Sequence, residues 1–590
     1  MKQSEKPDSQ LLSMCDVDCG GIQDWGGNGP IFRASRGYGV KSEQYSVREK
    51  AVVTPSYRSL PNQRVTWIRG HLSFAVTDLS ALPTSTYSLG VMSPVTDYKN
   101  PVPPSASLAP QTRLDSTLGH SKTHTRNILP SVENTMDPSK QPTAFIGLGA
   151  MGFGMATNLV RLGYQVTGFD VYAPTLDKFK AAGGLTSTSP AEAVTGKEFC
   201  VVMVATAEQA QGVLFEGDAP AISALQQGAV VLLCSTVPCA YVQGLQKELV
   251  ARNRGDIALV DCPVSGGAAR AAAGTLSIMA GAEEEAIQRG LHLLQAMSDP
   301  EKLYIVKGGI GAGSNMKMCH QVLAANQILS SSEALGFATH LGLDLPSTGE
   351  KIIKSEGWSW MFENRLPRML DAQFGPLASA VTIILKDTSI ITSEARRAGF
   401  PTPMTSTAEQ AYFAALGKGY GPDDDASLIR LYIEGAGKVG PVKPTVTSEE
   451  GKLSLVVNLL RGIHLCAAAE AIAFARFVGL DLEQVFELCI NAAGGSTMLS
   501  GEGRRIVDAI AAARSTHDWA ASGNESLLQT ISSDLQEAID EAQRLKLPLF
   551  LGTQALNLIR GILLTAGPKA PGLALGSVVS GWTARGSPAA

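Results

Sequence analysis

The sequence predicts an α/β domain with a parallel sheet, followed by an all-α region made of two related copies and preceded by a disordered leader. Short apolar runs alternate with helical segments from residue 141 to about residue 308, which is typical of a parallel sheet covered by helices. Strand-like runs stop near residue 310, and helical periodicity continues from there towards the C-terminus. The helical part also contains an internal repeat.

The composition favours several folded domains and argues against nucleic-acid or membrane partners. The chain has 590 residues, of which 44% are hydrophobic and 17% are charged, so it can build two or three cores. A net charge of -5 provides no positive field for a phosphate backbone. The sequence shows no uninterrupted apolar stretch of about 20 residues and no signal-peptide pattern at its start. We expect a soluble protein of the cytoplasm.

The cysteine pattern predicts no metal site. Nine cysteines are spread along the chain, and no second pair of cysteines or histidines lies near Cys15 and Cys19 to complete a zinc site. Free thiols in a reducing compartment are the expected state.

Residues 1–140 are rich in Ser, Pro, Thr and Gly and show no sustained helical or alternating period, which predicts a disordered leader. Met136 lies nine residues before Phe145, so a chain started there would keep every recognisable domain. The leader is either a regulatory tail or an extension ahead of the start used in the cell.

Five strand-like runs define the α/β domain, which we assign to residues 141–308. They are TAFIGLG, YQVTGFD, FCVVMVA, AVVLLCS and IALVDCPV. Each run is apolar or β-branched and is followed by a Gly, Ser or Pro turn, as expected for buried parallel strands.

A glycine-rich turn follows the first strand and predicts a Rossmann domain that binds a dinucleotide. The predicted cofactor-binding segment is Gly147, Leu148, Gly149, Ala150, Met151 and Gly152. In the G-x-G-x-x-G pattern, the first glycine permits the tight turn, the second lets a pyrophosphate approach, and the third allows close packing of helix on strand. The start of the helix offers unpaired N–H groups to the phosphates. A glycine triplet without this setting is often only a turn.

Polar residues at the ends of later strands extend this cofactor site. Asp170 lies 23 residues after Gly147, near the spacing of about 20 expected for the carboxylate that binds the ribose hydroxyls. A carboxylate there repels a 2′-phosphate, so the sequence favours NAD over NADP. Thr206, Ser235 and Thr236 end successive strands and would lie along the crevice in which open α/β sheets bind ligands.

Four motifs resemble those of the 3-hydroxyisobutyrate dehydrogenase family, also called β-hydroxyacid dehydrogenases, which are relatives of 6-phosphogluconate dehydrogenase. They are FIGLGAMGFGMA at the fingerprint, DCPVSGGAARAAAGTLSIMAG (261–281) at the family's substrate loop, GAGSNMKMCHQ (311–321) at its catalytic helix and ILKD (384–387) at its late Lys-Asp element. They occur in family order. The resemblance implies NAD-dependent oxidation of a small hydroxyacid, with helical domains like those of 6-phosphogluconate dehydrogenase.

The loop Ser265, Gly266 and Gly267 follows a strand and has few side chains. It is either an ordinary tight turn or a binding site that offers hydroxyl and backbone N–H groups to a carboxylate. The resemblance implies that this loop binds substrate.

Lys317 is the candidate for proton transfer. Oxidation of an alcohol by hydride transfer requires the hydroxyl to lose its proton, and a lysine whose pKa is lowered by burial can accept it. A helical lysine is more often solvated, but this one lies in Gly- and Met-rich surroundings and matches the family's catalytic lysine. Gln321, one turn further, stands where the family usually has Asn and is expected to contact substrate. His320 either contacts the site or packs as a core histidine.

Lys386 resembles the family lysine that closes over the nicotinamide and the substrate. Asp387 is its expected partner, and the alternative is a charged pair on a surface helix. Thr236 matches a family cofactor contact.

Within the family, the chain most resembles the L-threonate dehydrogenase group, whose substrates are four-carbon sugar acids. The segments that carry this likeness are KMCHQVLAANQI, WSWMFENR (358–365) and KGYGPDDDASLIRLY. A short polyhydroxy carboxylate therefore ranks above 3-hydroxyisobutyrate as substrate. Trp358 stands where this group has a small amide, and we expect it to reshape the pocket.

The internal repeat has an offset of 137 residues. EALGFATHLGLDL (333–345) is similar to EAIAFARFVGLDL (470–482), and Gly357, Ser359 and Met361 fall on Gly494, Ser496 and Met498. The predicted segments are a helical substrate and dimerisation domain at 309–439, a linker at 440–452, a second helical domain at 453–575 and a tail at 576–590.

The second copy lacks both candidate lysines. Lys317 corresponds to Ser454 at the repeat offset, and Lys386 corresponds to Ser533 where ILKD matches SSDL. The second copy therefore cannot run the same reaction alone. Helical domains of this family commonly mediate dimerisation, so we expect either a homo-oligomer or an internal pseudo-dimer in which the second copy docks on the first.

Two alternative functions share this architecture. One is a non-catalytic NAD(P)-binding scaffold, and the other is an imine reductase, which usually lacks the lysine. Retention of Lys317, Lys386 and the SGG loop favours the dehydrogenase.

Overall fold

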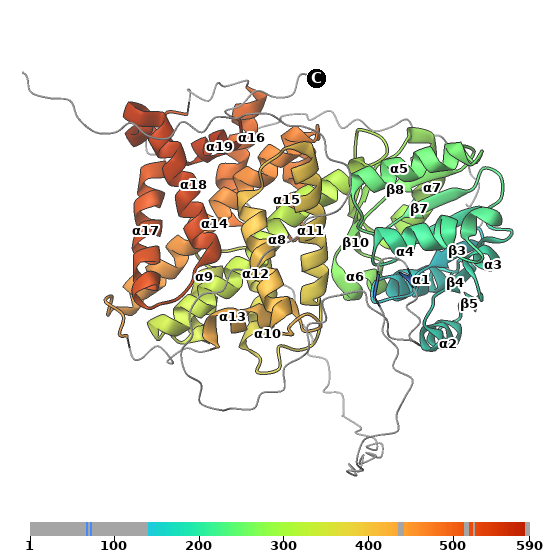
Figure 1. The fold of residues 1–590 in the computed structure, drawn as a ribbon, viewed down its shortest axis with the longest axis horizontal. Helices are drawn as coiled ribbons and strands as arrows, with labels where there is room; N and C mark the ends of the chain where they lie inside the picture. The colour runs from blue at the N-terminus through green and yellow to red at the C-terminus, as the bar shows by residue number, and fades with distance from the viewer. Residues whose placement is uncertain are drawn as a thin grey trace, which may run out of the picture. The chain divides into compact units, whose positions relative to one another are not determined.

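The computed structural model describes residues 140–434, 442–512, 519–522 and 526–583, together with two short strands near the N-terminus (Figure 1). These strands, β1 (Trp67–Ile68) and β2 (His71–Leu72), pair antiparallel within a unit that ends at Thr125. The rest of the predicted leader, including Cys15 and Cys19, lies outside the described residues, so its disorder stays a prediction.

A six-stranded parallel sheet forms the centre of the α/β domain. Its strands are β3 (Thr143–Ile146), β4 (Val166–Phe169), β5 (Leu185–Thr186), β6 (Phe199–Val202), β7 (Val230–Leu233) and β8 (Ala258–Asp261). They lie in the order β5-β4-β3-β6-β7-β8, and every neighbouring pair is parallel. The strands β4 and β5 are added on one side of β3, and β6, β7 and β8 are added on its other side. At such a switch point, α/β sheets bind ligands beyond the carboxyl ends of their strands.

Helices cover both faces of this sheet, which explains why its central strands are continuous apolar runs. The helices are α1 (Gly152–Arg161), α2 (Ala173–Ala181), α3 (Pro190–Val194), α4 (Ala207–Gln211), α5 (Cys239–Ala251), α6 (Gly267–Ala273) and α7 (Glu284–Met297). Phe145 points into a core shared with α1, α6 and α7, whereas Ile146 points into a core shared with α3, α4 and α5. Successive residues of a strand face opposite sides, so the central strands β3, β6 and β7 contribute to both cores.

A smaller sheet completes the domain and was not predicted. In it, β10 (Leu276–Ala280) pairs antiparallel with β9 (Val264–Ser265) and parallel with β11 (Ser298–Ile305). The strand β9 carries the first residue of the predicted substrate loop, and β11 leads towards the helical region.

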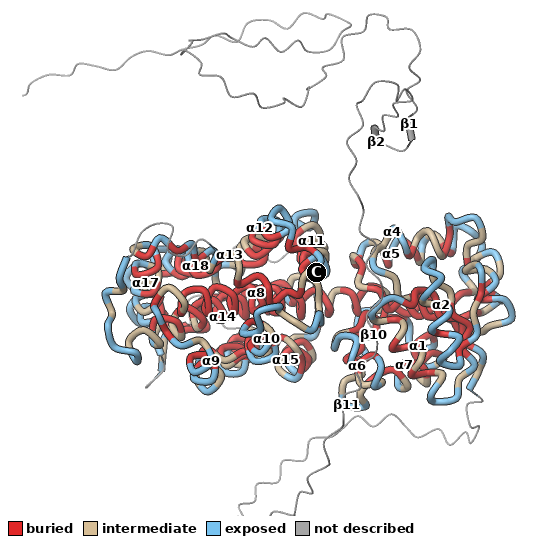
Figure 2. Tube along the Cα trace, turned by 90° about the horizontal axis from the view of Figure 1, so that it is seen from below, coloured by how far each residue is buried: buried red, intermediate tan, exposed pale blue. Residues whose placement is uncertain are grey.

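Two long helices form the core of the helical region. They are α8 (Ala312–Leu341) and α14 (Glu449–Phe477), which pack against each other and are buried over most of their length (Figure 2). By length and composition α14 could cross a membrane, but 83% of its most apolar window is buried inside the protein. Its apolar surface is therefore used in the core.

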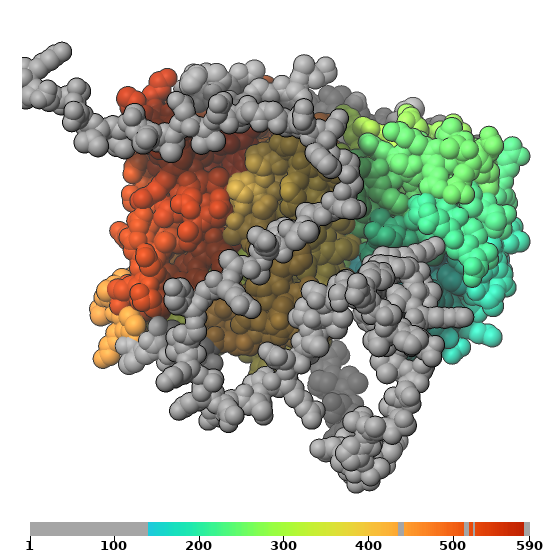
Figure 3. All heavy atoms as spheres, viewed as in Figure 1, coloured from blue at the N-terminus to red at the C-terminus, as the bar shows by residue number. Residues whose placement is uncertain are grey.

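Each long helix is surrounded by a similar set of shorter helices. The first set is α9 (Leu345–Ile353), α10 (Trp360–Leu370), α11 (Val381–Ala398), α12 (Pro403–Gly417) and α13 (Arg430–Ile433). The second set is α15 (Leu482–Ile490), α16 (Arg504–Ala511), α17 (Leu528–Arg544), α18 (Phe550–Ala566) and α19 (Ser580–Thr583). The helix α18 packs against both α17 and α12, and the red second copy adjoins the yellow-brown first copy on the face shown in Figure 3.

The two helical copies meet around an approximate two-fold axis. Ser359 pairs antiparallel with Ser496, its own equivalent in the repeat. On either side, the Trp360 N–H donates to the Gly495 carbonyl (2.9 Å) and the Thr497 N–H donates to the Trp358 carbonyl (3.2 Å). Trp360 is equivalent to Thr497 in the repeat, and Trp358 is equivalent to Gly495. Each copy therefore donates the same hydrogen bond to the other, as in an isologous dimer.

Side-chain packing repeats this exchange. A Cβ atom added at Gly494 would lie 3.0 Å from Leu323 on α8, and one added at Gly357 would lie 3.1 Å from Leu460 on α14. Gly357 and Gly494 are equivalent in the repeat, as are Leu323 and Leu460. Each glycine therefore leaves room for the leucine of the other copy.

Two predicted boundaries differ from the structure. The helix α14 begins at Glu449, inside the predicted linker 440–452, because the Ser448 hydroxyl caps it by accepting the Gly451 N–H. The predicted tail 576–590 begins too early, because a 3₁₀ turn (Leu575–Val579) is followed by α19 and Val578 is fully buried.

Candidate active site

The glycine-rich turn has the shape that the fingerprint predicts. Gly147 has φ = 93°, and a Cβ atom there would lie 2.2 Å from the Met203 carbonyl oxygen. A Cβ atom at Gly152 would lie 1.9 Å from the Gly147 carbonyl oxygen, so only glycine allows this approach. Gly149 is exposed and faces open space, and among the described residues no side chain caps the start of α1. The exposed backbone of Gly149 and Ala150 and the free helix start suit a pyrophosphate.

Asp170 lies directly after β4, beside this turn. One carboxylate oxygen accepts the Leu148 N–H (2.7 Å) and the other accepts the Tyr172 N–H (2.8 Å). These bonds hold the carboxylate of Asp170 next to the glycine-rich turn.

The polar residues that end β6 and β7 have different surroundings. Thr206 caps α4, since its hydroxyl accepts the Gln209 N–H (3.2 Å). Ser235 is fully buried and accepts the Val204 N–H (2.9 Å), which ties the ends of the two strands together. Thr236 contacts the helical region, because its carbonyl accepts a hydrogen bond from Lys386 (3.1 Å).

The predicted substrate loop turns sharply between β9 and α6. Gly266 has φ = 140° and Gly267 has φ = 75°, conformations that favour glycine. Both glycines are exposed, and Ser265 is half-buried. The loop thus presents backbone groups to solvent beside a serine hydroxyl.

Lys317 lies in the second turn of α8 and is only 5% exposed. The pKa of Lys317 is lowered to about 8, mainly by burial; the carboxylate of Asp387 opposes the decrease, and the positive charge of Lys386 contributes to it. A substantial fraction of the amine is therefore neutral near pH 8, and a neutral amine can accept a proton.

A hydrogen-bonded chain runs beside this lysine. The His320 Nδ1–H donates to Gln321 Oε1 (3.0 Å), and Gln321 Nε2 donates to Asp387 Oδ2 (2.6 Å). Burial lowers the pKa of His320 to about 3, so its ring is neutral at ordinary pH. His320 is thus a packed core histidine, and the Gln321 amide is held by its neighbours.

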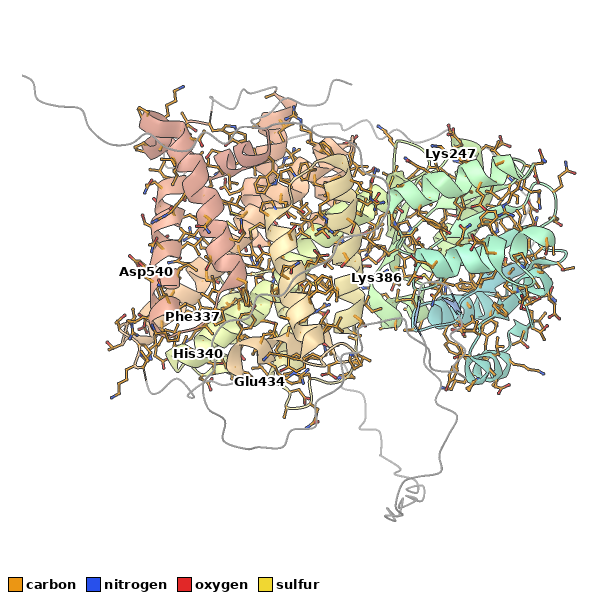
Figure 4. All side chains as sticks on the ribbon, in the orientation of Figure 1. Lys247, Phe337, His340, Lys386, Glu434 and Asp540 are labelled. Atoms are coloured by element: carbon orange, nitrogen blue, oxygen red, sulfur yellow. The ribbon has the colours of Figure 1, made fainter. Side chains whose placement is uncertain are left out.

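Lys386 lies on α11 on the side of the helical region that adjoins the α/β domain (Figure 4). Its Nζ is 2.9 Å from Asp387 Oδ1, and it also donates to the Thr236 carbonyl. The predicted Lys386–Asp387 pair is therefore present, and Lys386 joins the two domains.

Sequence reasoning missed two of the contacts that organise this site. Asp387 binds Gln321 as well as Lys386, and Glu394 on α11 accepts the Ala240 N–H at the start of α5 (3.2 Å). Both contacts join segments far apart in the chain, so no local pattern indicates them.

Trp358 lies at the interface of the two helical copies. Its indole N–H donates to Glu363 (2.7 Å), and its carbonyl accepts the Thr497 N–H. Its expected effect on the substrate pocket stays a prediction.

The equivalent face of the second copy carries different side chains. Ser454 and Ser533, at the lysine positions, are exposed. Asp534, which corresponds to Asp387, lies 3.3 Å from Arg461, and this arginine also donates to Asn458 (3.1 Å). Among the described residues, the second copy thus has an ion pair where the first has its lysines.

The described residues contain no cluster of three or more His, Cys, Asp or Glu side chains that could hold a metal ion. The cysteines in these ranges are free and buried.

Family models match nearly all of the described α/β and helical regions. A model described as the NAD binding domain of 6-phosphogluconate dehydrogenase matches residues 142–309. A model described as NAD-binding of NADP-dependent 3-hydroxyisobutyrate dehydrogenase matches twice, over residues 311–432 and 452–571. The double match confirms the predicted repeat.

Individual relatives agree with these matches. The L-threonate dehydrogenase of Cupriavidus necator is 37% identical over 50% of this chain and 97% of its own length. An NAD-dependent L-serine dehydrogenase of Pseudomonas aeruginosa is 32% identical over 49% of this chain and 97% of its own. The solved 6-phosphogluconate dehydrogenase of Plasmodium falciparum covers 71% of this chain and 92% of its own, with a TM-score of 0.51 and 15% identity. That likeness shows the fold alone.

Proposed function

The chain belongs to the 3-hydroxyisobutyrate dehydrogenase family, and we propose that it oxidises a short 3-hydroxyacid with NAD, using Lys317 as the general base. Its relatives are dehydrogenases, so the chain is an oxidoreductase that uses a nicotinamide cofactor. The observation that carries the proposal is a buried lysine with a lowered pKa beside Lys386 and Asp387.

The residues of the site have separate roles in this reaction. Bound NAD would accept the hydride from the carbon that carries the hydroxyl group. The neutral amine of Lys317 accepts the hydroxyl proton as the ketone forms, and returns it in the reverse direction. The loop Ser265–Gly267 offers hydroxyl and N–H groups to the substrate carboxylate, and Gln321 adds an amide. Lys386 supplies a positive charge between the domains.

The cofactor proposed is NAD, with NADP disfavoured. The open space at Gly149 and the uncapped start of α1 fit a pyrophosphate. Asp170 places a carboxylate where a 2′-phosphate would be repelled, and Val171, Tyr172 and Ala173 after it include no basic side chain to bind that phosphate. The similarity to an NAD-dependent L-serine dehydrogenase supports this choice.

The substrate class proposed is a short polyhydroxy carboxylate resembling L-threonate. Support comes from the 37% identity to an L-threonate dehydrogenase over almost all of that protein. A loop that bears a hydroxyl and N–H groups also suits a small anion with several hydroxyl groups.

We also propose that the second helical copy replaces the partner subunit of a dimer, which leaves one active unit per chain. The support is the two-fold exchange of contacts around Ser359 and Ser496. The serines at positions 454 and 533 leave the second copy without the side chains for proton transfer.

A screen of C3 to C5 hydroxyacids with NAD and NADP, followed by nicotinamide absorbance, tests the function. We expect turnover with a sugar acid and NAD, and a loss of about 10²- to 10⁴-fold in kcat for Lys317→Ala with the cofactor still bound. Cofactor binding without turnover on any hydroxyacid would favour the scaffold. Turnover of cyclic imines alone would identify an imine reductase, and unchanged turnover in Lys317→Ala would exclude the proposed mechanism.

A further inference from the structure

Asp261 is a buried carboxylate that the proposed mechanism does not use. It is the last residue of β8, four residues before Ser265, and is fully buried. One of its oxygens accepts the Ser314 N–H (2.7 Å), and the other accepts the Ser314 hydroxyl (2.8 Å). A single side chain thus receives two donors from Ser314, in the first turn of α8.

The geometry explains why the carboxylate is needed there. The first N–H groups of a helix have no partner within the helix, and α8 begins after Gly311, which has no side chain to cap it. An anion at a helix start is favoured by the helix dipole. Asp261 therefore caps α8 from a different domain, which joins the cap to the strand that leads into the substrate loop.

The backbones of the two domains also meet at this point. A Cβ atom at Gly313 would lie 2.3 Å from the Met279 carbonyl oxygen and 2.5 Å from that of Asp261. A Cβ atom at Gly281 would lie 2.6 Å from the Gly313 nitrogen. The first turn of α8 is thus pressed against β8 and β10, and Lys317 follows Ser314 by about one turn.

We propose that Asp261 is a positioning residue that fixes the first turn of α8 to β8, the strand that leads into the substrate loop, and so sets Lys317 at working distance from the bound hydroxyacid. This rests on the proposed function, because it assigns proton transfer to Lys317. Misplacing a reacting group by about 1 Å can cost about 100-fold in rate, so loss of this anchor should lower kcat strongly.

The variant Asp261→Asn tests the proposal in the full-length protein. Asn keeps the shape but removes the negative charge, and its NH₂ group can only donate, so the Ser314 hydroxyl would have to accept a hydrogen bond instead of donating one. We expect kcat to fall about 10- to 100-fold while KM for NAD changes less than about twofold, since the glycine turn and Asp170 are untouched. The matched control is Asp344→Asn, which alters another helix-capping aspartate, at the start of α9, where it accepts the Ser347 N–H (3.0 Å). It should leave kcat unchanged.

Substitutions of Ser314 provide a second test, which separates positioning of Lys317 from a role in folding alone. Ser314→Thr keeps the hydroxyl and should retain kcat, whereas Ser314→Ala should lose part of it. If the two residues act through one another, Asp261→Asn and Ser314→Ala combined will lose less than the product of their separate losses. Independent, multiplying losses would contradict the coupling.

Hydrogen exchange separates failure of this proposal from failure of the proposed function. Asp261→Asn should speed amide exchange at residues 313–317, and Asp344→Asn should not. If the wild-type protein turns over a hydroxyacid and Asp261→Asn has the same kcat, the positioning role is overturned. Faster exchange in Asp261→Asn, in a protein that turns over no hydroxyacid, overturns the proposed function and supports the anchor.

Discussion

Glu333 and Glu470 occupy equivalent positions on α8 and α14, and each carboxylate caps a helix that belongs to the other copy. The donors are the N–H groups of Leu551 (2.8 Å) and Gly552 (3.2 Å) for Glu333, and of Met404 (2.8 Å) and Thr405 (2.9 Å) for Glu470. The first pair begins α18 and the second begins α12. Because each copy supplies the cap that the other needs, the helical copies are interdependent.

These caps predict how stability changes with pH. Burial raises the pKa of Glu333 to about 7 and that of Glu470 to about 7, from 4.5. A folded-state pKa above the unfolded value means that the stabilisation is complete below about pH 4.5 and is lost as pH rises through about 7. A shift of this size is worth roughly 3 kcal/mol for each group.

The measurement is the melting temperature between pH 5 and pH 8. In the wild type these two groups should lower it across this range, and Glu333→Gln and Glu470→Gln should each flatten the decrease. Glu537→Gln, an exposed glutamate on α17, serves as the control. A wild-type slope that survives in both cap variants would show that these carboxylates do not titrate as proposed.

Removal of the second helical copy should expose the apolar face of α8 that packs against α14. A chain that ends before residue 446 loses α14 and α18, and with them the apolar partner of α8 and the N–H donors of Glu333. An exposed apolar helix face and a carboxylate that keeps only the Tyr432 hydroxyl (3.2 Å) as a donor are both unfavourable. We expect aggregation or dimerisation in sedimentation or light-scattering experiments. A well-behaved, active monomer would rule out the built-in partner.

The positive charge of Lys386 should shift the pH dependence of catalysis. Oxidation needs neutral Lys317, so kcat for oxidation should rise with pH through about 8. Lys386 lowers the pKa of Lys317, so Lys386→Met should raise that pKa and move the profile to higher pH. Lys386→Arg keeps the charge and should shift the profile less. If the methionine and arginine variants give the same midpoint, the charge of Lys386 does not set this pKa.

Much of the α/β fold was predictable because its signals are local. The five main strands are continuous apolar runs, and the glycine turn between β3 and α1 is a motif of six residues. By contrast, β5 has only two residues, and β11 (SDPEKLYI) is polar and partly exposed, so neither has the apolar pattern of a buried strand. In the small sheet, β9 also has only two residues, so β10 (LSIMA) alone carries the apolar pattern of a buried strand.

The sequence predicted which residues form the candidate site better than it predicted which of them contact one another. Lys317, Lys386 and the SGG loop stand in recognisable motifs, but Asp261 and Ser314 are 53 residues apart, and Gln321 and Asp387 are 66 apart. Nothing in a single sequence pairs such residues. The reciprocal packing of the copies was also hidden, because the repeat offset changes from 137 residues at Glu333 to 147 residues at Asp387.

Cofactor choice should depend on the charge of Asp170. Asp170→Asn keeps an oxygen that can accept the Leu148 N–H, so the glycine turn should hold its shape while the repulsion of a 2′-phosphate disappears. We expect the ratio of kcat/KM for NAD over NADP to fall by at least about tenfold, which corresponds to about 1.4 kcal/mol. Asp177→Asn removes the same charge from an exposed position on α2 and should leave the ratio unchanged. Equal effects of the two substitutions would mean that general electrostatics, and not the position of Asp170 beside the turn, determine the preference.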